Sequence, residues 1–460
     1  MTHYFCARLL LMALACGADS SPGSGDPSPL PSPVTLVIRG ASVFDAERGI
    51  MIPDSDILIA GERIAFVGPP GESPAVPAGV RALVGEGKYV IPGLIDAHVH
   101  LVHVLNFAGI TGDEVLPLFL AAGVTAVRCT GDEIVALTGV AHFAAAHPVR
   151  GPRVFTCSPL IDGEPPIHRD AGRAVTDPAQ VPTFVEEMAR WNVTTLKIYA
   201  GTQRPVGKAV IEEGHRRGLL VAAHLGPYRA QDAVADGIDS LEHIWSVFNY
   251  IIPPEAAAQP DHRATLDLTN PLAEQLIADI AKRKVLVAPT LCVFRNMLLL
   301  PDLEEILHHP DNELVPRRLR QFWPLYTPNP QATLELRRRE FAKYQELTAR
   351  LQRAGVTILA GTDAPEPNVP PGFSLHQELE LLVAAGLSPS QALQAATWNN
   401  ARALKQEPDL GSLAAGKLAD LVILSKNPLD DIRHTRSIEC VIRGGCAVDP
   451  EELLKLVPRE

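Results

Sequence analysis

The 460-residue sequence lacks several features that would point to particular protein classes. No apolar run reaches the ~18 residues that a membrane-spanning helix needs. Basic residues are fewer than acidic ones: the sequence has 41 Lys and Arg and 53 Asp and Glu, which gives a net charge of −12. This balance offers no basic footprint for nucleic acid. No internal repeat is evident, and the seven cysteines do not form a disulfide framework, although Cys440 and Cys446 flank a Gly-Gly turn and their pairing stays open.

What the chain contains is an ordinary globular composition, with 46% hydrophobic and 20% charged residues. Its length is enough for one large barrel-type domain and a smaller domain. Its substrate is therefore expected among small molecules rather than nucleic acids.

The first 33 residues form a separate segment in the sequence. Arg8 precedes the apolar run LLLMALA, and small residues surround Cys16. This pattern is typical of a short signal peptide, and the residues leading into Cys16 resemble a bacterial lipobox. A Ser-, Pro- and Gly-rich stretch follows and reads as a tether. We therefore expect export to the cell envelope, periplasm or medium, with membrane attachment only through a lipidated Cys16; the alternative is a leader without function.

Both ends of the remaining chain have a β-type pattern. Short β-prone runs broken by turn residues fill 34–90, and a similar pattern returns over 407–460. The economical arrangement is one small β-sandwich domain built from both chain ends, with residues 91–406 inserted between them.

Residues 91–406 alternate short apolar runs with segments of helical period, which is typical of parallel βα units. Eight strands are expected, at 93–101, 124–130, 153–159, 193–200, 219–225, 239–244, 285–291 and 356–363. Eight such units predict an α/β fold of the (β/α)₈ TIM-barrel type. The insertion between the last two strands is expected to contain a helix with one apolar face, after a Pro-rich loop, FWPLYTPNP, over the barrel mouth.

Polar residues occur where these apolar strands end, at the barrel face that carries active sites. His98 and His100 alternate on the first strand, so both side chains point to one side. The other strand-end residues of this kind are Lys197, His224, His243 and Asp363. Each would be costly to bury alone, so we expect the six to converge.

Four imidazoles and a carboxylate form a nitrogen and oxygen ligand set suited to zinc, and also to manganese, nickel or iron. The set is too large for one open tetrahedral ion and suits two divalent ions. An ammonium at Lys197 would be repelled by them, whereas a lysine carbamate (N6-carboxylysine) would offer one oxygen to each ion. The simpler reading of Lys197 is a snorkelling lysine at a strand end.

The motifs that carry these residues resemble those of the amidohydrolase superfamily. They are PGLIDAHVH, LKIYA, AAHLG, DSLEHI and AGTDAP, followed by GSLAAGKLADLVIL near the C-terminus. The resemblance extends from Val34 to Val448 and is strongest to the binuclear branch with a carboxylated lysine, which includes imidazolonepropionase-like and prolidase-like hydrolases. Imidazolonepropionases proper lack the strand-four lysine, so Lys197 argues against that particular activity.

The resemblance implies a role for each residue. His98, His100 and Asp363 would hold the more buried ion, His224 and His243 the other, and the Lys197 carbamate would bridge them. A hydroxide between the ions would attack the scissile carbonyl. Asp363 would be the catalytic residue that takes the hydroxide proton and delivers it to the leaving nitrogen.

Candidate substrate-binding residues follow the strand ends. They are His168, Arg169, Tyr199, Tyr228, Arg229 and Arg295, with Trp245 as a pocket-lining candidate. A guanidinium there would suit the carboxylate of a dipeptide or N-acyl amino acid. Each residue is equally consistent with an ordinary loop or packing position.

We therefore expect a hydrolase that acts on carbon–nitrogen bonds in amides, dipeptide-like compounds or cyclic amides. A lactonase or an ester or phosphotriester hydrolase is the enzymatic alternative, because the same metal centre attacks those groups. A non-catalytic metal-binding scaffold is a remote alternative, because such proteins usually lose ligands and this sequence has all six.

Overall fold

The computed structural model describes residues 33–299, 304–326 and 332–460. The expected signal peptide, tether and lipidated Cys16 lie outside these residues. None of the helices in the described part combines the length and apolarity that a bilayer crossing requires.

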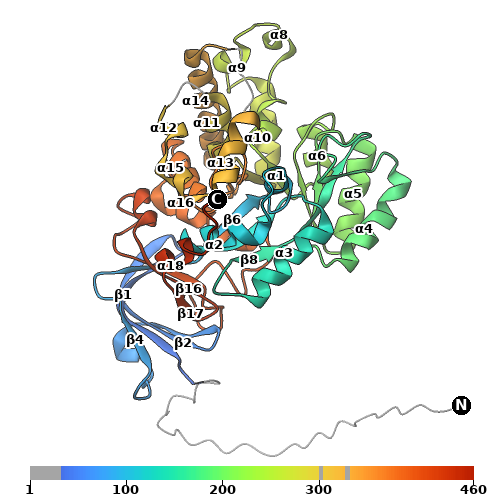
Figure 1. The fold of residues 1–460 in the computed structure, drawn as a ribbon. Helices are drawn as coiled ribbons and strands as arrows, with labels where there is room; N and C mark the ends of the chain where they lie inside the picture. Colours follow the sequence, from blue (N-terminus) through green and yellow to red (C-terminus); the bar gives the residue numbers. More distant parts are fainter. Residues whose placement is uncertain (1–32, 300–303, 327–331) are drawn as a thin grey trace, which may run out of the picture. The chain divides into compact units, whose positions relative to one another are not determined.

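A mixed sheet of eight strands is built from both ends of the chain, whose blue and red strands lie together in Figure 1. Its strands are β1 (Leu36–Asp45), β2 (Ile50–Ala60), β3 (Arg63–Gly68), β4 (Arg81–Val84), β5 (Tyr89–Pro92), β15 (Leu421–Leu424), β16 (Ile438–Arg443) and β17 (Cys446–Val448). The N-terminal and C-terminal strands join where β5 pairs antiparallel with β15. This confirms the predicted β-rich domain from both ends.

The strands form one curved sheet rather than two separate ones. At its far edge, the Ile64 amide on β3 donates to the Lys417 carbonyl and the Gly416 amide to the Ile64 carbonyl, just before β15. The sheet therefore returns to its own strands and encloses a buried cluster that includes Ile38, Ile57 and Leu421. Apolar side chains on alternate residues of these strands supply that core.

The pairing of β16 with β17 separates the two cysteines of this domain. Cys446 lies opposite Arg443, three residues from Cys440. That offset is about 10 Å along the strand, beyond the ~7 Å that a disulfide spans between Cα atoms. Both cysteines are unpaired, so the open question of their pairing is resolved against a disulfide.

The barrel consists of parallel strands, as predicted. They are β6 (Leu94–Val99), β7 (Val124–Cys129), β8 (Arg153–Phe155), β9 (Cys157–Asp162), β11 (Thr195–Ile198), β12 (Leu220–Ala223), β13 (Ser240–Glu242) and β14 (Leu286–Ala288), with β10 (Gly172–Ala174) beside β9. The predicted third strand is divided at Thr156, because β8 pairs with β7 and β9 pairs with β11.

The predicted eighth strand lies between β14 and β6 and closes the barrel. The Leu359 amide donates to Val287, and the Ala97 amide donates to Ala360. Only isolated bridges form here, at Ile358 and Ala364, because the Ala360 amide bonds instead to Ala395 and Asp363 has a left-handed backbone with φ 67°. The segment is thus barrel-forming without a regular ladder.

Helices cover the outside of the barrel (Figure 1). They include α2 (Gly112–Ala121), α3 (Ile134–Ala146), α4 (Val181–Arg190), α5 (Arg204–Arg216), α6 (Ala230–Asp236), α10 (Pro271–Arg283), α15 (Phe373–Ala384), α16 (Pro389–Ala395) and α17 (Trp398–Ala403). Shorter helices are α1 (His103–Phe107), α7 (Trp245–Phe248), α8 (Pro254–Ala257), α9 (His262–Thr265) and α18 (Pro450–Leu454). Ser388 caps the N-terminus of helix α16 and forms the expected capping box with Gln391.

The insertion before the last barrel strand is mainly helical. It contains α11 (Leu291–Leu299), α12 (Glu304–Leu307), α13 (Arg317–Tyr326) and α14 (Leu334–Arg353), the last being the predicted amphipathic helix. The Pro-rich loop prediction is wrong for FWPLY, which lies in α13, while TPNP falls outside the described residues. Burial of Trp323, whose indole donates to the Pro365 carbonyl, anchors this helix despite Pro324.

Candidate metal-dependent active site

A cavity of about 100 Å³ lies at the carboxyl ends of the barrel strands. All six predicted metal-site residues line it: His98, His100, Lys197, His224, His243 and Asp363. They come from the ends of five barrel strands, because His98 lies on β6 and His100 directly follows it. The structure therefore brings the predicted set together.

Three of these residues form the tightest group. One ligand atom from each of His98, His243 and Asp363 lies within 4.8 Å of the others, a spacing suited to a metal ion. His100 joins this group, because its Nε2 lies 3.2 Å from Asp363 Oδ1. The centroid of the His224 ring lies 4.7 Å from that of the His243 ring.

Buried partners orient the imidazoles. His98 donates through Nδ1 to Glu242 at 2.7 Å, and His100 donates through Nδ1 to the Gly131 carbonyl at 2.9 Å. In the neutral rings these bonds place the proton on Nδ1 and leave Nε2 as the atom that could bind a metal ion. His98 Nε2 is buried and makes no hydrogen bond among the described residues, although Asp363 Oδ1 lies 3.3 Å away.

His243 and Asp363 also share an unusual backbone conformation. Both have positive φ, 65° and 67°, which non-glycine residues seldom adopt. The Asp363 amide donates to His98 O at 2.7 Å, and the His243 amide donates to Ala288 O at 2.8 Å. Such strain of order 1–3 kcal/mol is often found at functional sites, where neighbouring bonds enforce it.

The Lys197 ammonium group is buried without a polar partner among the described residues. Its side chain is 1% exposed, and its Nζ is buried without a hydrogen bond to any described residue. Burial therefore lowers the pKa of Lys197, with the charge of Glu242 acting in the opposite direction. An isolated buried ammonium is costly, so this position favours a neutral amine or a modified one.

Charges in the cavity shift the other groups in opposite directions. Burial opposes ionisation of Asp363, but His243 and His98 outweigh it and hold the pKa of Asp363 well below its usual range. Burial and the charge of Lys197 lower the pKa of His224 to about 3. Burial would lower the pKa of His100, yet Asp132 and Asp363 raise it to about 10.

The predicted substrate residues are divided by the structure. His168 and Tyr199 line the cavity, as does Trp245, and His168 Nε2 lies 2.9 Å from the Tyr199 hydroxyl. Among the described lining residues, Tyr228, Arg229 and Arg295 do not appear. Arg169 is exposed and is likewise not part of the lining.

Each of the three absent residues has another position. The Tyr228 hydroxyl donates to Asp236, and the ring packs under Gly207 of α5. Arg229 is exposed just before α6. The Arg295 guanidinium turns to Gln377 Oε1 at 2.7 Å. Their assignment as substrate contacts does not agree with these positions.

Sequence reasoning missed several residues that contact or line the site. They are Arg128, Asp132, Glu242, Thr290, His103 and Glu366. Arg128 and Glu242 carried a signal, since each is a charge inside an apolar strand, and they pair at 2.7 Å. Glu366 lines the cavity, and burial followed by the charge of Asp363 raises its pKa to about 8.

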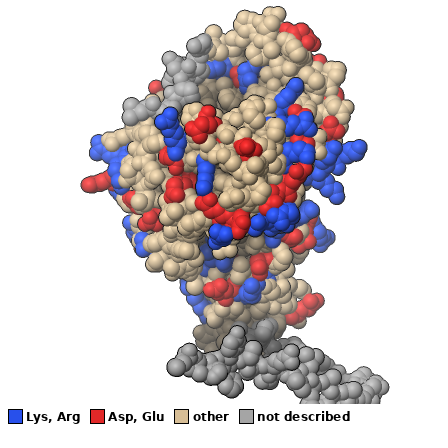
Figure 2. Space-filling view, turned by 90° about the vertical axis from the view of Figure 1, so that its right-hand side faces the viewer, with Lys and Arg blue, Asp and Glu red and all other residues tan. Residues whose placement is uncertain are grey.

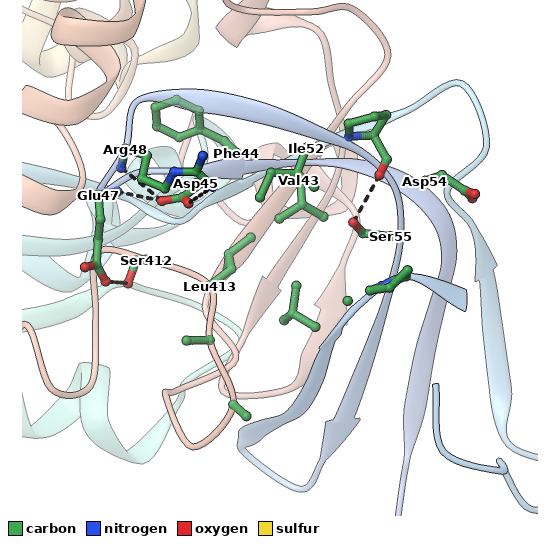
Figure 3. Close-up of a pocket in the computed structure, with 16 residues that line it drawn as sticks. Val43, Phe44, Asp45, Glu47, Arg48, Ile52, Asp54, Ser55, Ser412 and Leu413 are labelled. Atoms are coloured by element: carbon green, nitrogen blue, oxygen red, sulfur yellow. Dashed lines mark hydrogen bonds and ion pairs between the residues drawn. The ribbon is translucent and has the colours of Figure 1, made fainter. Parts of the chain in front are cut away.

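A larger hollow of about 640 Å³ lies in the β-rich domain (Figure 3). Figure 3 shows β1 and β2 side chains such as Val43 and Ile52 on one side and Ser412 and Leu413 on the other. Its described lining contains no histidine or cysteine, so it offers no ligand set comparable to that of the barrel cavity. On the face seen in Figure 2, basic and acidic side chains are interspersed.

Comparison with known proteins decides the family. Residues 89–448 match the family model described as the amidohydrolase family. The chain belongs to the amidohydrolase family. Within it, an imidazolonepropionase from Anaeromyxobacter sp. is 26% identical over 432 residues, covering 85% of this amidohydrolase and 89% of the relative.

Other relatives differ in length and assigned activity. An adenine deaminase from Mesorhizobium japonicum is 25% identical over 407 residues, which is 85% of this amidohydrolase but only 54% of the relative. The chain thus spans about half the length of that relative. The crystal structure of a putative prolidase from Bifidobacterium longum has a TM-score of 0.70 at 27% identity, covering 92% of this chain and all (100%) of the other.

These matches support a (β/α)₈ barrel with a β-rich domain and a hydrolase that acts on C–N bonds of small molecules. The family generally uses divalent metal ions, and the His98, His243 and Asp363 cluster is of the kind that binds them. The predicted family, fold class and enzyme class are therefore confirmed.

Proposed function

We propose that this amidohydrolase holds two divalent metal ions, zinc in preference, and hydrolyses an amide-type C–N bond. His98, His100 and Asp363 would hold one ion, and His224 and His243 the other. A carboxylated Lys197 would be shared by both. The observation that carries this proposal is a pair of buried nitrogens, His98 Nε2 and Lys197 Nζ, that make no hydrogen bond to any described residue and lie in the same cavity as the Asp363 carboxylate. Imidazole nitrogen and carboxylate oxygen are the ligands that zinc prefers.

Carboxylation of Lys197 follows from its surroundings. Burial favours the neutral amine, whose lone pair is the nucleophile that adds to carbon dioxide. The nitrogen forms a bond to carbon and releases one proton, giving a carbamate anion with two oxygens. The new negative charge would lie among imidazoles and cations, where the unmodified ammonium would be repelled.

When bound, the ions would lower the pKa of a coordinated water and polarise the scissile carbonyl. The chain's own residues orient and move protons. Asp363 is the general base, since its carboxylate is kept ionised and projects into the cavity, and it returns the proton to the leaving nitrogen. Glu242 holds His98 in the tautomer that leaves Nε2 available.

An activity assay on a panel of compounds tests this proposal. The panel contains simple amides, Xaa-Pro and Xaa-Arg dipeptides, N-acyl amino acids, cyclic ureides, lactones and phosphotriesters. We expect turnover of at least one C–N compound by zinc-loaded protein. Turnover of lactones or phosphotriesters alone would assign the alternative activity to the same centre. No turnover of any compound by protein with a full metal complement would support the non-catalytic scaffold instead.

Export is a separate proposal, supported by the apolar run after Arg8 and the small residues around Cys16. Mass spectrometry of the full-length protein expressed in a bacterium measures its N-terminus. We expect removal of the leader, with a lipid mass added if Cys16 becomes the first residue. An intact N-terminus in the cytosol would contradict export.

A further inference from the structure

One wall of the catalytic cavity is apolar and adjoins the proposed metal ligands. Val293, Phe294 and Met297 of α11 line it, together with Trp245. The Phe294 ring lies 5.7 Å from the His243 ring and 5.0 Å from the Trp245 ring. A substrate whose scissile group reaches His243 therefore lies against aromatic and aliphatic surface.

The described lining of the cavity offers no arginine, and no lysine outside the proposed metal centre, for a substrate carboxylate. Lys197 is the only lysine or arginine among its described lining residues, and it belongs to the proposed metal centre. The Arg295 guanidinium donates to Gln377, and the Arg263 guanidinium lies 5.4 Å from the Trp245 ring and pairs with Glu340. The segments 300–303 and 327–331 of the same insertion contain no lysine or arginine in the sequence. Glu366 adds a further carboxyl group to the lining.

The polar wall presents an acceptor. His103 is 4% exposed and lines the cavity, and its Nδ1 donates to Asp170 Oδ2 at 2.6 Å. In the neutral ring this bond leaves the lone pair on Nε2, which has no hydrogen-bond partner among the described residues. An amide N–H satisfies that lone pair, whereas a carboxylate oxygen faces it with another lone pair.

Apolar side chains continue beyond this wall to the surface. Phe107, at the end of α1, lies 5.3 Å from the His103 ring and is 51% exposed. Ile167 precedes His168 and is 57% exposed. Large exposed apolar side chains beside a pocket are typical of a ligand-binding surface.

We propose that the substrate of this amidohydrolase is an uncharged amide bearing an aryl or branched alkyl group, without a carboxylate beside the scissile bond. This inference rests on the proposed function and narrows it. The apolar group lies on Phe294, Met297 and Trp245, and the amide N–H donates to His103. Dipeptides and N-acyl amino acids are disfavoured because, outside the metal centre, the described lining has no lysine or arginine to pair with their carboxylate.

A matched pair of compounds tests the inference. N-acetylphenethylamine and N-acetylphenylalanine differ only by the carboxylate. For zinc-loaded protein we expect kcat/KM at least tenfold higher for N-acetylphenethylamine. Equal values, or preference for N-acetylphenylalanine, would overturn the inference while leaving C–N hydrolysis intact.

Two variants place a cation at the apolar surface. Met297→Arg should reduce the preference at least fivefold, whereas the matched Met297→Leu should keep it. Met297→Lys places a smaller cationic group at the same position of the cavity lining, so it tests the same point if Met297→Arg fails to fold. An unchanged ratio in every folded cationic variant of Met297 would contradict the proposed placement of the apolar group.

Binding separates this inference from the proposed function. If neither compound is hydrolysed, titration calorimetry on the metal-loaded protein measures their dissociation constants. Tighter binding of N-acetylphenethylamine supports the inference even where turnover fails, and tighter binding of N-acetylphenylalanine overturns it. Absence of turnover across the whole C–N panel is the outcome that rejects the proposed function.

Discussion

Glu242 is the residue whose replacement should most clearly reveal how the barrel supports the site. Its carboxylate is fully buried and accepts hydrogen bonds from His98 Nδ1, Arg128 Nη2 and Ser240 Oγ, each at 2.7 Å. Arg128 is 2% exposed and has no other carboxylate within ion-pair distance among the described residues. The substitution Glu242→Gln keeps the shape of the side chain but removes its negative charge. The NH₂ group of the glutamine replaces one of the two acceptor oxygens, so it faces an N–H of either Arg128 or His98.

The expected cost follows from the uncompensated Arg128. Breaking a buried ion pair by neutralising one partner destabilises proteins by about 3–5 kcal/mol. We expect Glu242→Gln to lower the free energy of unfolding by about that amount, measured by urea unfolding in chelator. We also expect zinc affinity to fall about 10–100-fold, because the bond that orients His98 is weakened.

Glu378→Gln is the matched control. Glu378 is also fully buried, but it accepts hydrogen bonds from the backbone amides of Leu291 and Cys292 and makes no ion pair among the described residues. Glu378→Gln should cost about 1–3 kcal/mol, because its amide nitrogen leaves one buried backbone N–H unsatisfied but no charge unpaired. If both variants unfold at the same urea concentration, the charge network around Glu242 does not have the structural importance we assign to it.

Three further predictions concern turnover, the pocket wall and pH. Asp363→Asn should retain metal, measured by elemental analysis, but lose about 10²–10⁴-fold in kcat, because the general base is absent; kcat within tenfold of wild type would contradict that role. Arg263→Ala should raise KM several-fold with little change in kcat, because the guanidinium 5.4 Å from the Trp245 ring holds this wall in place; Arg263→Lys should give an intermediate KM, and an unchanged KM in both would reject the positioning role. Burial raises the pKa of Glu378 to about 7, so the folded state binds its proton more tightly than the unfolded chain, and metal-free protein should lose stability as pH rises from about 4.5 to 7. Glu378→Gln should reduce that loss in melting temperature, and a pH profile identical to wild type would contradict the shift.

The sequence carries most of the information about the barrel and the convergence of its ligands. Because side chains alternate along a strand, His98 and His100 are predicted to point to the same side of the sheet. Lys197, His224 and His243 are predicted to join them because each lies at the end of a barrel strand. The parallel barrel then brings residues far apart in the chain to one face. These predictions are possible because the backbone of a β-strand determines to which side each side chain points.

Loops impose no such direction, which is why the substrate residues were predicted less well. Tyr228 and Arg295 follow barrel strands but turn to Asp236 and Gln377, and nothing local in the sequence specifies those partners. The pairing of Arg128 with Glu242 likewise joins strands 114 residues apart. A buried charge in an apolar strand signals that a partner exists without identifying it.

Metal content and the state of Lys197 test the central proposal most directly. Elemental analysis of zinc-loaded protein should give about two ions per chain, and protein equilibrated with ¹³C-labelled carbon dioxide should show a carbamate carbon signal by NMR. Lys197→Met should lose that signal and at least one ion. One ion per chain with an unmodified Lys197 would contradict the two-metal centre.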